Sequence, residues 1–397
     1  MAAADPHQAE PIPSEARVEI DRLLQSGDLF RYTAEEGAPV SLLEKEFAEL
    51  MGAKYALAVS SCSAALFLAL KSLRLPRDAR VLIPGFTFAA VPSSIVHAEC
   101  IPVLCEVGPD YRIDIDDFSA RLQKDISAVI VSHMRGHTSD MDAIMSLCND
   151  MGIPVVEDAA HSLGTLWRGK KIGTIGRVGC FSFQSYKMIN AGEGGIMVSD
   201  DADLIAQAVI MSGAYEHNWR KHAGLEAAFA RWQNKLPLYN LRMSNLSAAV
   251  IRPQLPHLKR RVRDGKIGHD HVAELLETSP WISVPVPLEG EARAPDSIQF
   301  NLVELSDDQV HDFVAHAGAR GVKVQVFGLS KNNARAFWNW QFLPHQEELP
   351  QTRKMLMRAC DVRLPVHLIE AEREAIADAL LSAIDATMNE NQKAYGT

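Results

Sequence analysis

The chain has 397 residues, of which 47% are hydrophobic and 23% are charged, and its formal net charge is −10. One small core cannot serve so long a chain, because single hydrophobic cores stop growing at about 250–300 residues. The ordinary hydrophobic content excludes a wholly disordered chain. The acidic balance argues against a protein that holds nucleic acid on a basic surface.

The N-terminal segment MAAADPHQAEPIPSEAR is polar and lacks the apolar centre of a secretory signal peptide, so a flexible lead-in is expected. No apolar run approaches the ~20 residues that a membrane-spanning helix needs. These two features predict a soluble, cytoplasmic protein.

Between residues 40 and 255, short β-rich runs alternate with helical patterns. The strands expected are 55–60, 81–84, 101–107, 127–134, 153–158, 180–184 and 195–199. The helices expected among them are 41–52, 63–73, 87–98 and 140–152. Because the strands are apolar throughout and do not alternate with polar residues, they predict a mainly parallel sheet covered by helices on both faces.

After residue 255 the pattern changes to a basic helical stretch, a Pro-rich segment and a second β-α-β pattern. The segments expected there are a helix over 257–277, a strand over 297–305, a helix over 307–321, a strand over 322–327 and an amphipathic helix over 370–388. We therefore predict two domains: residues 1–255 as an N-terminal arm and a large domain, and residues 256–397 as a small C-terminal α/β domain.

The cysteines and histidines give no sign of a disulfide framework or a metal site. No cysteines form a CxxC pair and most lie in apolar segments, so reduced core residues are expected at Cys62, Cys100, Cys105, Cys148, Cys180 and Cys360. There is no HExxH motif, and the sequence His269-Asp270-His271 is more typical of a solvated helix face than of metal ligands. No metal is predicted.

Three segments carry the chemistry, and the first is the small-residue turn SSCSAAL (60–66) between a strand and a helix. Such a turn directs backbone N–H groups outward at the positive end of a helix, which suits a phosphate. An ordinary helix N-cap explains Ser63 equally well.

The second segment is VVEDAAHS (155–162), in which Asp158 ends an apolar strand. A carboxylate is costly to bury there without a partner. Asp158 is either a capping residue or an anion paired with a protonated ring nitrogen of a cofactor. His161, three residues further on, could touch the same cofactor.

The third segment is FSFQSYKMINAGEGG (181–195), in which Lys187 stands between a β-rich stretch and a Gly-rich turn. If Lys187 is desolvated its pKa falls, which favours the neutral amine that a Schiff base needs. Ser182 could supply a hydroxyl to a cofactor phosphate.

In this order the segments resemble the DegT/DnrJ/EryC1/StrS aminotransferases, which are fold-type-I enzymes that use pyridoxal 5′-phosphate (PLP). KYALAVSSCSAAL resembles the family's strand, small-residue turn and helix, VLIPGFTFAA its aromatic segment, and IPVVEDAAHSLG its aspartate strand. CFSFQSYKMINAGEGG resembles its lysine loop, and YNLRMSNLSAAVIRPQL (239–255) its Asn-x-Arg segment. The resemblance implies an α/β fold of type I, with a large domain around a mainly parallel, seven-stranded type of sheet and a small C-terminal α/β domain.

The resemblance also implies a role for each matching residue. Lys187 would form the internal aldimine and later move the proton, and Asp158 would keep the pyridine nitrogen protonated so that the ring acts as an electron sink. Phe88 would stack on the ring, and His161 stands where the family often has Gln. The phosphate would be seated by Cys62, Ser63 and Ser182.

Asn240 resembles a family residue that reaches a phosphate from the neighbouring subunit, which implies a homodimer with shared active sites. Within the same stretch, Ser244 or Asn245 is also expected to cap the following helix.

This sequence departs from the family pattern at two places. The turn that commonly reads Ser-Gly-Thr is here Ser61-Cys62-Ser63, so a side chain stands where Gly allows close approach. The Tyr-Pro-x-His-type segment of many sugar-specific members is replaced by the aromatic stretch 324–344, which carries Arg335. Trp338 and Trp340 of that stretch are expected in the core more than in the substrate site.

The activity implied is a PLP-dependent aminotransferase that takes an amino group from glutamate or glutamine and gives it to an oxo-sugar or related ketone, in amino-sugar or secondary-metabolite biosynthesis. Other PLP chemistry, by an epimerase or a carbon–carbon bond-forming enzyme, stays open. A non-catalytic PLP-binding regulatory protein is a further alternative, against which the intact Lys187, Asp158 and Ser182 weigh. The sequence does not name the acceptor.

Overall fold

The computed structural model describes residues 9–33, 36–215, 218–222, 224–329, 333–344 and 347–395. Residues 1–8 of the expected flexible lead-in lie outside this part of the chain. Residues 15–17 of the same lead-in are helical, so the expectation was wrong for them: they begin α1 (Glu15–Ser26), which buries Ala16 and Leu23 and ends at Gly27, a left-handed cap. No helix among the described residues is long and apolar enough to cross a membrane.

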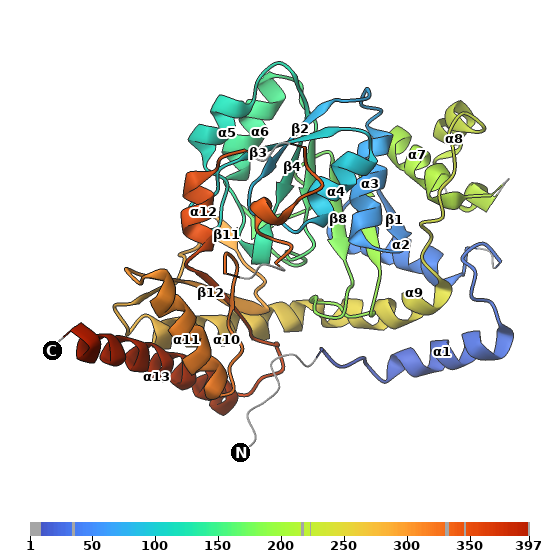
Figure 1. The fold of residues 1–397 in the computed structure, drawn as a ribbon. Helices are drawn as coiled ribbons and strands as arrows, with labels where there is room; N and C mark the ends of the chain where they lie inside the picture. Colours follow the sequence, from blue (N-terminus) through green and yellow to red (C-terminus); the bar gives the residue numbers. More distant parts are fainter. Residues whose placement is uncertain are drawn as a thin grey trace.

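A seven-stranded, mostly parallel sheet forms the centre of the molecule, as the apolar strands predicted (Figure 1). Its strand order is β1-β9-β8-β5-β4-β2-β3, and only β9 runs against the others. The strands are β1 (Tyr55–Val59), β2 (Arg80–Pro84), β3 (Ile101–Cys105), β4 (Ile126–Ser132), β5 (Val155–Asp158), β8 (Val178–Ser182) and β9 (Gly195–Ser199).

Helices cover both faces of this sheet because successive apolar side chains of each strand point to opposite faces. In β2, Val81 and Ile83 belong to one core cluster and Leu82 to the other. The first cluster packs against α3 (Cys62–Ser72), α4 (Ala90–His97), α7 (Ala202–Gly213) and α8 (Glu226–Trp232). The second packs against α2 (Pro39–Met51), α5 (Ile115–Arg121), α6 (Met141–Asp150) and α9 (Asn245–Ile251).

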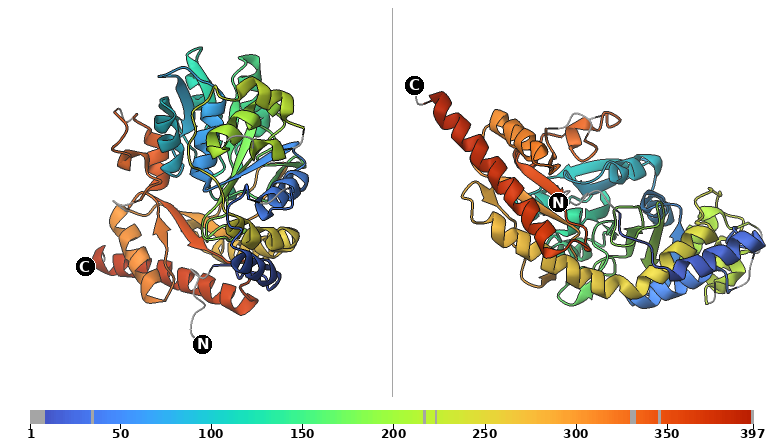
Figure 2. Two further views of the ribbon diagram at one scale, coloured as in Figure 1. Left: turned by 90° about the vertical axis from the view of Figure 1, so that its right-hand side faces the viewer. Right: turned by 90° about the horizontal axis from the view of Figure 1, so that it is seen from below.

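The long helix α10 (Leu258–Leu276) leads from the large sheet to a smaller antiparallel sheet (Figure 2). The smaller sheet has the order β10-β12-β14-β13 and packs its apolar face against α11 (Asp307–Ala319) and α13 (Glu370–Tyr395). Its strands are β10 (Ile282–Ser283), β12 (Ser297–Leu302), β13 (Gln325–Val326) and β14 (Ala359–Arg363). The expected β-α-β pattern is therefore present as β12-α11-β13, but β14, which the sequence analysis missed, lies between its two strands.

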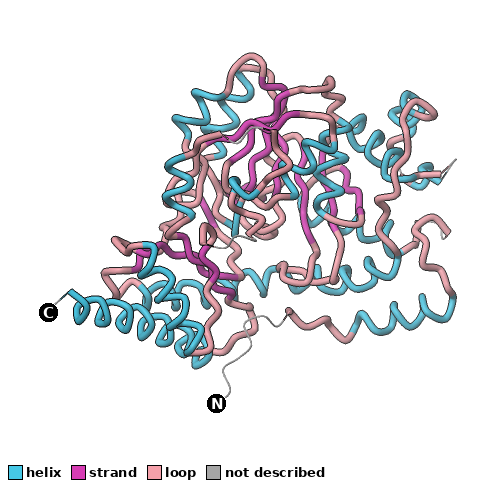
Figure 3. The backbone as a smooth tube through the Cα atoms, in the orientation of Figure 1, coloured by secondary structure: helices cyan, strands magenta, loops and turns pink. Residues whose placement is uncertain are grey.

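The remaining elements are short and join these layers (Figure 3). β11 (Glu291–Ala292) pairs with β6 (Leu166–Trp167), which pairs with β7 (Lys170–Lys171). The other short helices are η1 (Met134–Gly136), η2 (Asn218–Lys221), η3 (Arg252–His257), η4 (Phe337–Asn339) and α12 (Pro350–Leu356).

The expectation that the aromatic stretch packs in the core is confirmed for Trp340, whereas Trp338 is only partly buried. Phe337 and Trp340 are buried in the cluster that covers one face of the large sheet, and Trp340 donates its ring N–H to the Ala334 carbonyl at 2.9 Å. This stretch follows α11 in the chain but packs against the large sheet, so the two layers do not separate at a single point in the sequence. The domain boundary near residue 255 therefore stays a prediction.

The expectations for cysteine and histidine have different outcomes. All six cysteines are buried and free, as expected of reduced core residues. The solvated-face expectation was wrong for His269, which is buried on the inner face of α10 with Nδ1 3.2 Å from Asp270.

Candidate active site

A cavity of about 980 Å³ lies at the carboxyl ends of β1, β4, β5 and β8 and extends to β13 and β14 of the smaller sheet. Seven of the eight site residues expected from the sequence line it: Cys62, Ser63, Phe88, Asp158, His161, Ser182 and Lys187. The carboxyl ends of parallel strands meet at one edge, which is why residues far apart in sequence converge here.

One end of the cavity is formed by the first turn of α3. The N-cap is Ser61, whose hydroxyl accepts the Ala64 N–H at 3.1 Å, so the expectation that Ser63 could be the cap was wrong. Ser63 and Cys62 stand instead in the first helical turn and face the cavity. This leaves backbone donors at the positive end of the helix available to an anion.

Gly195 keeps that end of the cavity in place. It begins β9 beside the turn, and a Cβ atom there would lie 2.2 Å from the Ser61 carbonyl carbon and 2.4 Å from the Cys62 nitrogen. Only glycine permits this approach, so the turn and the end of the lysine loop are fixed against each other.

Asp158 ends β5 as a buried carboxylate held by three neighbours. Its Oδ2 accepts the Ser132 hydroxyl at 2.7 Å, and its Oδ1 accepts the Ala160 N–H at 3.1 Å and lies 3.9 Å from the Cys62 sulfur. Ser132 in turn accepts the Thr87 hydroxyl at 2.8 Å. The sequence analysis missed Ser132 and Thr87. The only signal was the position of Ser132 at the end of an apolar strand.

Lys187 lies in the loop between β8 and β9 with its amine in the cavity. Its Nζ is 2.9 Å from Nε2 and 3.2 Å from Nδ1 of His161. Burial, together with the Arg135 cation, lowers the pKa of Lys187 to about 7. Burial and the Lys187 ammonium lower the pKa of His161 well below its ordinary value. Near neutral pH the Lys187 amine therefore loses its proton far more readily than an ordinary lysine.

Hydrogen bonds from two side chains outside the loop hold the backbone of the loop that carries Lys187. The Gln254 side chain donates to the Asn190 carbonyl at 2.7 Å and accepts the Asn190 N–H at 3.1 Å. Arg261 donates to the Met188 carbonyl at 2.7 Å. These contacts hold the backbone around Lys187 through side chains of η3 and α10.

Phe88 presents an aromatic ring to the cavity. The residue is 45% exposed, which is unusual for a phenylalanine beside the core and leaves its ring free to stack on a flat ligand. The guanidinium of Arg335 lies 5.7 Å from the ring centroid.

Arg135 is a further cavity residue that the sequence analysis missed. Its backbone is left-handed (φ 54°), and its buried guanidinium donates to Asp361 of β14. Backbone strain of this kind persists only where the surroundings enforce it. No local sequence signal marks it, because the carboxylate partner is supplied from the smaller sheet.

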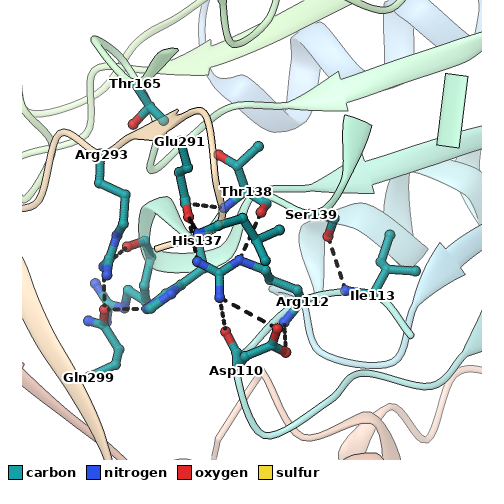
Figure 4. Close-up of polar contacts among 12 residues, drawn as sticks. Asp110, Arg112, Ile113, His137, Thr138, Ser139, Thr165, Glu291, Arg293 and Gln299 are labelled. Atoms are coloured by element: carbon teal, nitrogen blue, oxygen red, sulfur yellow. Dashed lines mark hydrogen bonds and ion pairs between the residues drawn. The ribbon is translucent and has the colours of Figure 1, made fainter. Parts of the chain in front are cut away.

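A buried polar network lies beside Arg135, and Figure 4 shows the part of it that includes Arg112, Glu291 and Gln299. Gln299 donates to Asp361 at 2.8 Å, and Arg293 contacts both the Gln299 side-chain oxygen at 3.3 Å and the Arg135 carbonyl at 3.4 Å. Behind them, Glu291 pairs with Arg112 and accepts the Thr138 N–H at 2.8 Å, while Gln299 also contacts His137 at 3.0 Å. The network joins the loop after β4 to β11 and β12.

Asn240 differs from the other expected site residues, because it is exposed and does not line the cavity of the single chain. The neighbouring Leu241 carbonyl accepts the Ser60 N–H at 2.9 Å, which places the segment beside the end of β1. Ser244 caps α9, as one of the two expectations had it, by accepting the Ser247 N–H.

The sequence comparisons identify the family. The profile of the DegT/DnrJ/EryC1/StrS aminotransferase family matches residues 13–381. The chain belongs to the DegT/DnrJ/EryC1/StrS aminotransferase family. Members of this family depend on PLP.

The chain aligns with about three-fifths of the length of the curated relatives that it resembles. GDP-perosamine synthase of Vibrio cholerae is 32% identical over 233 residues, which cover 58% of this chain and 61% of the relative. The spore coat polysaccharide biosynthesis protein SpsC of Bacillus subtilis is 33% identical over 256 residues, 64% of each chain.

Solved structures of aminotransferases share the fold. The PseC aminotransferase of Helicobacter pylori superimposes with a TM-score of 0.84 at 17% identity, covering 96% of this chain and 99% of the other. The aminotransferase TlmJ of Streptoalloteichus hindustanus has a TM-score of 0.83 at 21% identity, with the same two coverages.

The donor set of the cavity fits PLP. It offers a desolvated lysine amine, a buried carboxylate and a half-exposed aromatic ring. It also offers the N-terminus of α3, which lies close to the end of the lysine loop because residue 195 is a glycine. The one possible metal cluster among the described residues, His271, Glu370 and Glu374, has two exposed carboxylates and does not line this cavity.

Proposed function

We propose that this protein is a PLP-dependent aminotransferase that moves an amino group from glutamate or glutamine to an oxo-sugar or related ketone, in amino-sugar or secondary-metabolite biosynthesis. The observation that carries the proposal is the Lys187 amine, which lies against His161 in the same cavity as the buried Asp158. When bound, PLP supplies an electron sink for the carbon that exchanges its amino group.

The residues divide the work of holding the cofactor. Asp158, fixed by Ser132, would provide the negative charge opposite the pyridine nitrogen, and the first turn of α3 with Ser182 would seat the phosphate. Phe88 would stack on one face of the ring, and His161 would stand on the other side.

Lys187 has two tasks. Its amine would attach the cofactor covalently, for which it must be neutral, and would then move a proton at Nζ. The lowered pKa, about 7, serves both tasks, since a base whose pKa lies near the working pH can gain and lose the proton readily.

We further propose that the protein acts as a homodimer in which Asn240 of one chain completes the phosphate site of the other. The exposure of Asn240 and its place beside the end of β1 support this proposal. The division into residues 1–255 and 256–397 is likewise proposed, with α10 as the connection between the two parts.

The test uses the PLP-loaded protein in two stages. Glutamate or glutamine is first added alone, and conversion of the bound cofactor to its amine form is followed by absorbance. A panel of oxo-sugars and other ketones is then added, and amine products are sought by mass spectrometry. An enzyme that epimerises the substrate or forms a carbon–carbon bond would not transfer nitrogen, and a non-catalytic binder would show no change at either stage.

A further inference from the structure

Two consecutive residues of the N-terminal segment, Glu10 and Pro11, bind three separate parts of the molecule. The Glu10 carbonyl accepts the Asn190 side-chain N–H at 3.0 Å, and the Pro11 carbonyl accepts a guanidinium N–H of Arg261 at 3.3 Å. The Glu10 carboxylate accepts the Val366 N–H at 2.8 Å. These partners belong to the lysine loop between β8 and β9, to α10 and to the segment between β14 and α13. A dipeptide that precedes the first helix therefore joins three elements that lie far apart in the sequence.

Glu10 is buried, although the residues that follow it are exposed. Its exposed fraction is 7%, whereas Pro11 and Ile12 lie at the surface. Besides the Val366 N–H, its Oε1 atom has Nδ1 of His367 at 3.3 Å. The first residues of a domain are usually poorly ordered unless specific contacts hold them, and a carboxylate is costly to bury unless it is bound. The burial of Glu10 therefore points to a specific role for this carboxylate.

Glu10 also compensates the charge of a buried arginine. Arg261 is 3% exposed and donates to the carbonyls of Met188, at 2.7 Å, and of Pro11. Burial lowers the pKa of Arg261, and the charge that counteracts this most is the Glu10 carboxylate. Removing one of two opposite buried charges is costly, because the other is left without compensation. The contact of Arg261 with the lysine loop therefore depends on Glu10.

Two of the elements that Glu10 joins contribute side chains to the cavity. Lys187 stands three residues before Asn190 in the lysine loop. Arg363, the last residue of β14, stands three residues before Val366 and lines the cavity. Its guanidinium donates to the carbonyl of the residue before Lys187 at 2.8 Å. Glu10 does not line the cavity, so it links from outside the same two elements that Arg363 links at the cavity wall.

We propose that Glu10 is a positioning residue of the active site, which holds the lysine loop against the smaller sheet so that Lys187 and Arg363 keep their relative position during the reaction. This inference rests on the proposed function, because it takes Lys187 as the residue that holds the cofactor. Small displacements of a reacting group are costly, since an error of ~1 Å can reduce a rate by about 10²-fold. If Glu10 only fastened the N-terminal segment, its loss would lower the stability and leave the reaction of the folded protein unchanged.

The first experiment follows backbone hydrogen exchange by mass spectrometry in the PLP-loaded, full-length protein. In Glu10→Ala, exchange should become at least about tenfold faster both at Val366, which loses its acceptor, and in the peptide 188–191 of the lysine loop, as expected for the loss of a hydrogen bond to a charged group. Glu10→Gln should lie between, because an amide oxygen can accept the Val366 N–H but has no charge for Arg261. Glu15→Ala is the matched control, since Glu15 is exposed at the start of α1.

A change at the other end of the connection tests it in reverse. Asn190→Asp keeps a side-chain oxygen that accepts the Gly192 N–H but removes the N–H that binds the Glu10 carbonyl. Exchange at Val366 should then rise severalfold, because the Glu10 carboxylate is loosened together with its carbonyl. This variant also tests the inference if Glu10→Ala does not fold.

The second experiment measures the reaction with glutamate or glutamine in a single turnover at saturating donor. Glu10→Ala should react about 10- to 100-fold more slowly than the wild-type protein, Glu10→Gln should recover part of the rate, and Glu15→Ala should match the wild-type rate. Thermal melting shows that each variant is folded at the assay temperature.

Faster exchange at Val366 with an unchanged peptide 188–191 would overturn the inference, because Glu10 would then hold only the segment after β14. A wild-type rate of the folded Glu10→Ala protein would also overturn it, since the role of Glu10 would be structural alone. Failure of the proposed function appears separately, as a wild-type protein in which neither amino acid changes the cofactor absorbance. In that case the exchange experiment still decides whether Glu10 holds the lysine loop.

Discussion

The Lys187 amine approaches the His161 ring between its two nitrogens, at 2.9 Å from Nε2 and 3.2 Å from Nδ1. This contact places a neutral imidazole against a lysine whose pKa is lowered to about 7. The Arg135 cation acts on both groups and further disfavours their protonation. The reactivity of Lys187 therefore depends on a neighbour that comes from the loop after β4.

The first prediction concerns the titration of Lys187 in the protein without PLP. Competitive labelling with acetic anhydride, followed by peptide mass spectrometry, should show half-maximal reactivity of Lys187 near pH 7, in contrast to about 10.4 for an ordinary lysine. Arg135→Gln should raise this midpoint, because the Arg135 cation is one cause of the lowered pKa. An unchanged midpoint in the variant would show that burial alone sets the pKa.

The same shift predicts how stability depends on pH. Between pH 7 and about 10.4 the unfolded chain keeps the Lys187 proton and the folded chain has lost it, so the free energy of unfolding should rise with pH in this window. Lys187→Met should reduce that slope in denaturant titrations of the protein without PLP. An identical slope in both proteins would contradict the shift.

Replacing the lysine itself should abolish covalent attachment of PLP. In Lys187→Ala, borohydride treatment should leave no PLP adduct in the mass spectrum, and turnover should fall by at least about 10²–10⁴-fold, the range for a lost acid–base group. Lys170→Ala is the control, because Lys170 is exposed on the β6–β7 hairpin. An adduct on Lys187→Ala at wild-type yield would remove Lys187 from the mechanism.

Asp158→Asn should still bind PLP but should slow the reaction by about 10²–10³-fold, since a neutral amide does not balance the positive ring nitrogen. Ser132→Ala should have a smaller effect, up to about tenfold, because Asp158 keeps its charge and loses one hydrogen bond. Single-turnover kinetics with glutamate measure both. If Asp158→Asn works at the normal rate, another group holds the ring nitrogen.

Gly195→Ala should displace the first turn of α3, because the added methyl group would meet the Ser61 backbone at 2.2 Å. We expect a loss of about 1–3 kcal/mol in the free energy of unfolding and weaker PLP binding in a cofactor titration. Gly318→Ala is the control: its Cβ meets nothing within 4 Å on helix α11, and alanine should be neutral or stabilise by up to about 1 kcal/mol. Equal effects of the two changes would argue against the close approach at Gly195.

The proposed sharing of active sites predicts complementation between two inactive chains. A mixture of Lys187→Ala and Asn240→Glu proteins should recover roughly a quarter of wild-type activity, because half of the dimers are mixed and one of their two sites is intact. Subunit exchange is verified with differently tagged chains. Proven exchange without recovery would mean that each site is built from one chain.

The sequence by itself determined the layered α/β arrangement and most of the predicted site residues that line the cavity. Continuous apolar strands such as IPVVED can be buried only if helices cover both faces, so the pattern alone indicates the central sheet. Asp158 and Lys187 could be selected because each is a charged residue in a setting where burial is costly, next to a strand end or a Gly-rich turn. These are local signals that a short segment carries without its partners.

Only the tertiary structure decided which other side chains serve the site. The contact of Ser132 with Asp158 and the pairing of Arg135 with Asp361 join residues 26 and 226 positions apart. Nothing in either neighbourhood specifies such partners. β14 was missed for the same reason, since ACDVR, which carries two charged residues in five, becomes a buried central strand only when β12 and β13 pair with its two edges. The charge of a cavity is the sum of side chains from several elements, and this sum exists only once the chain has folded.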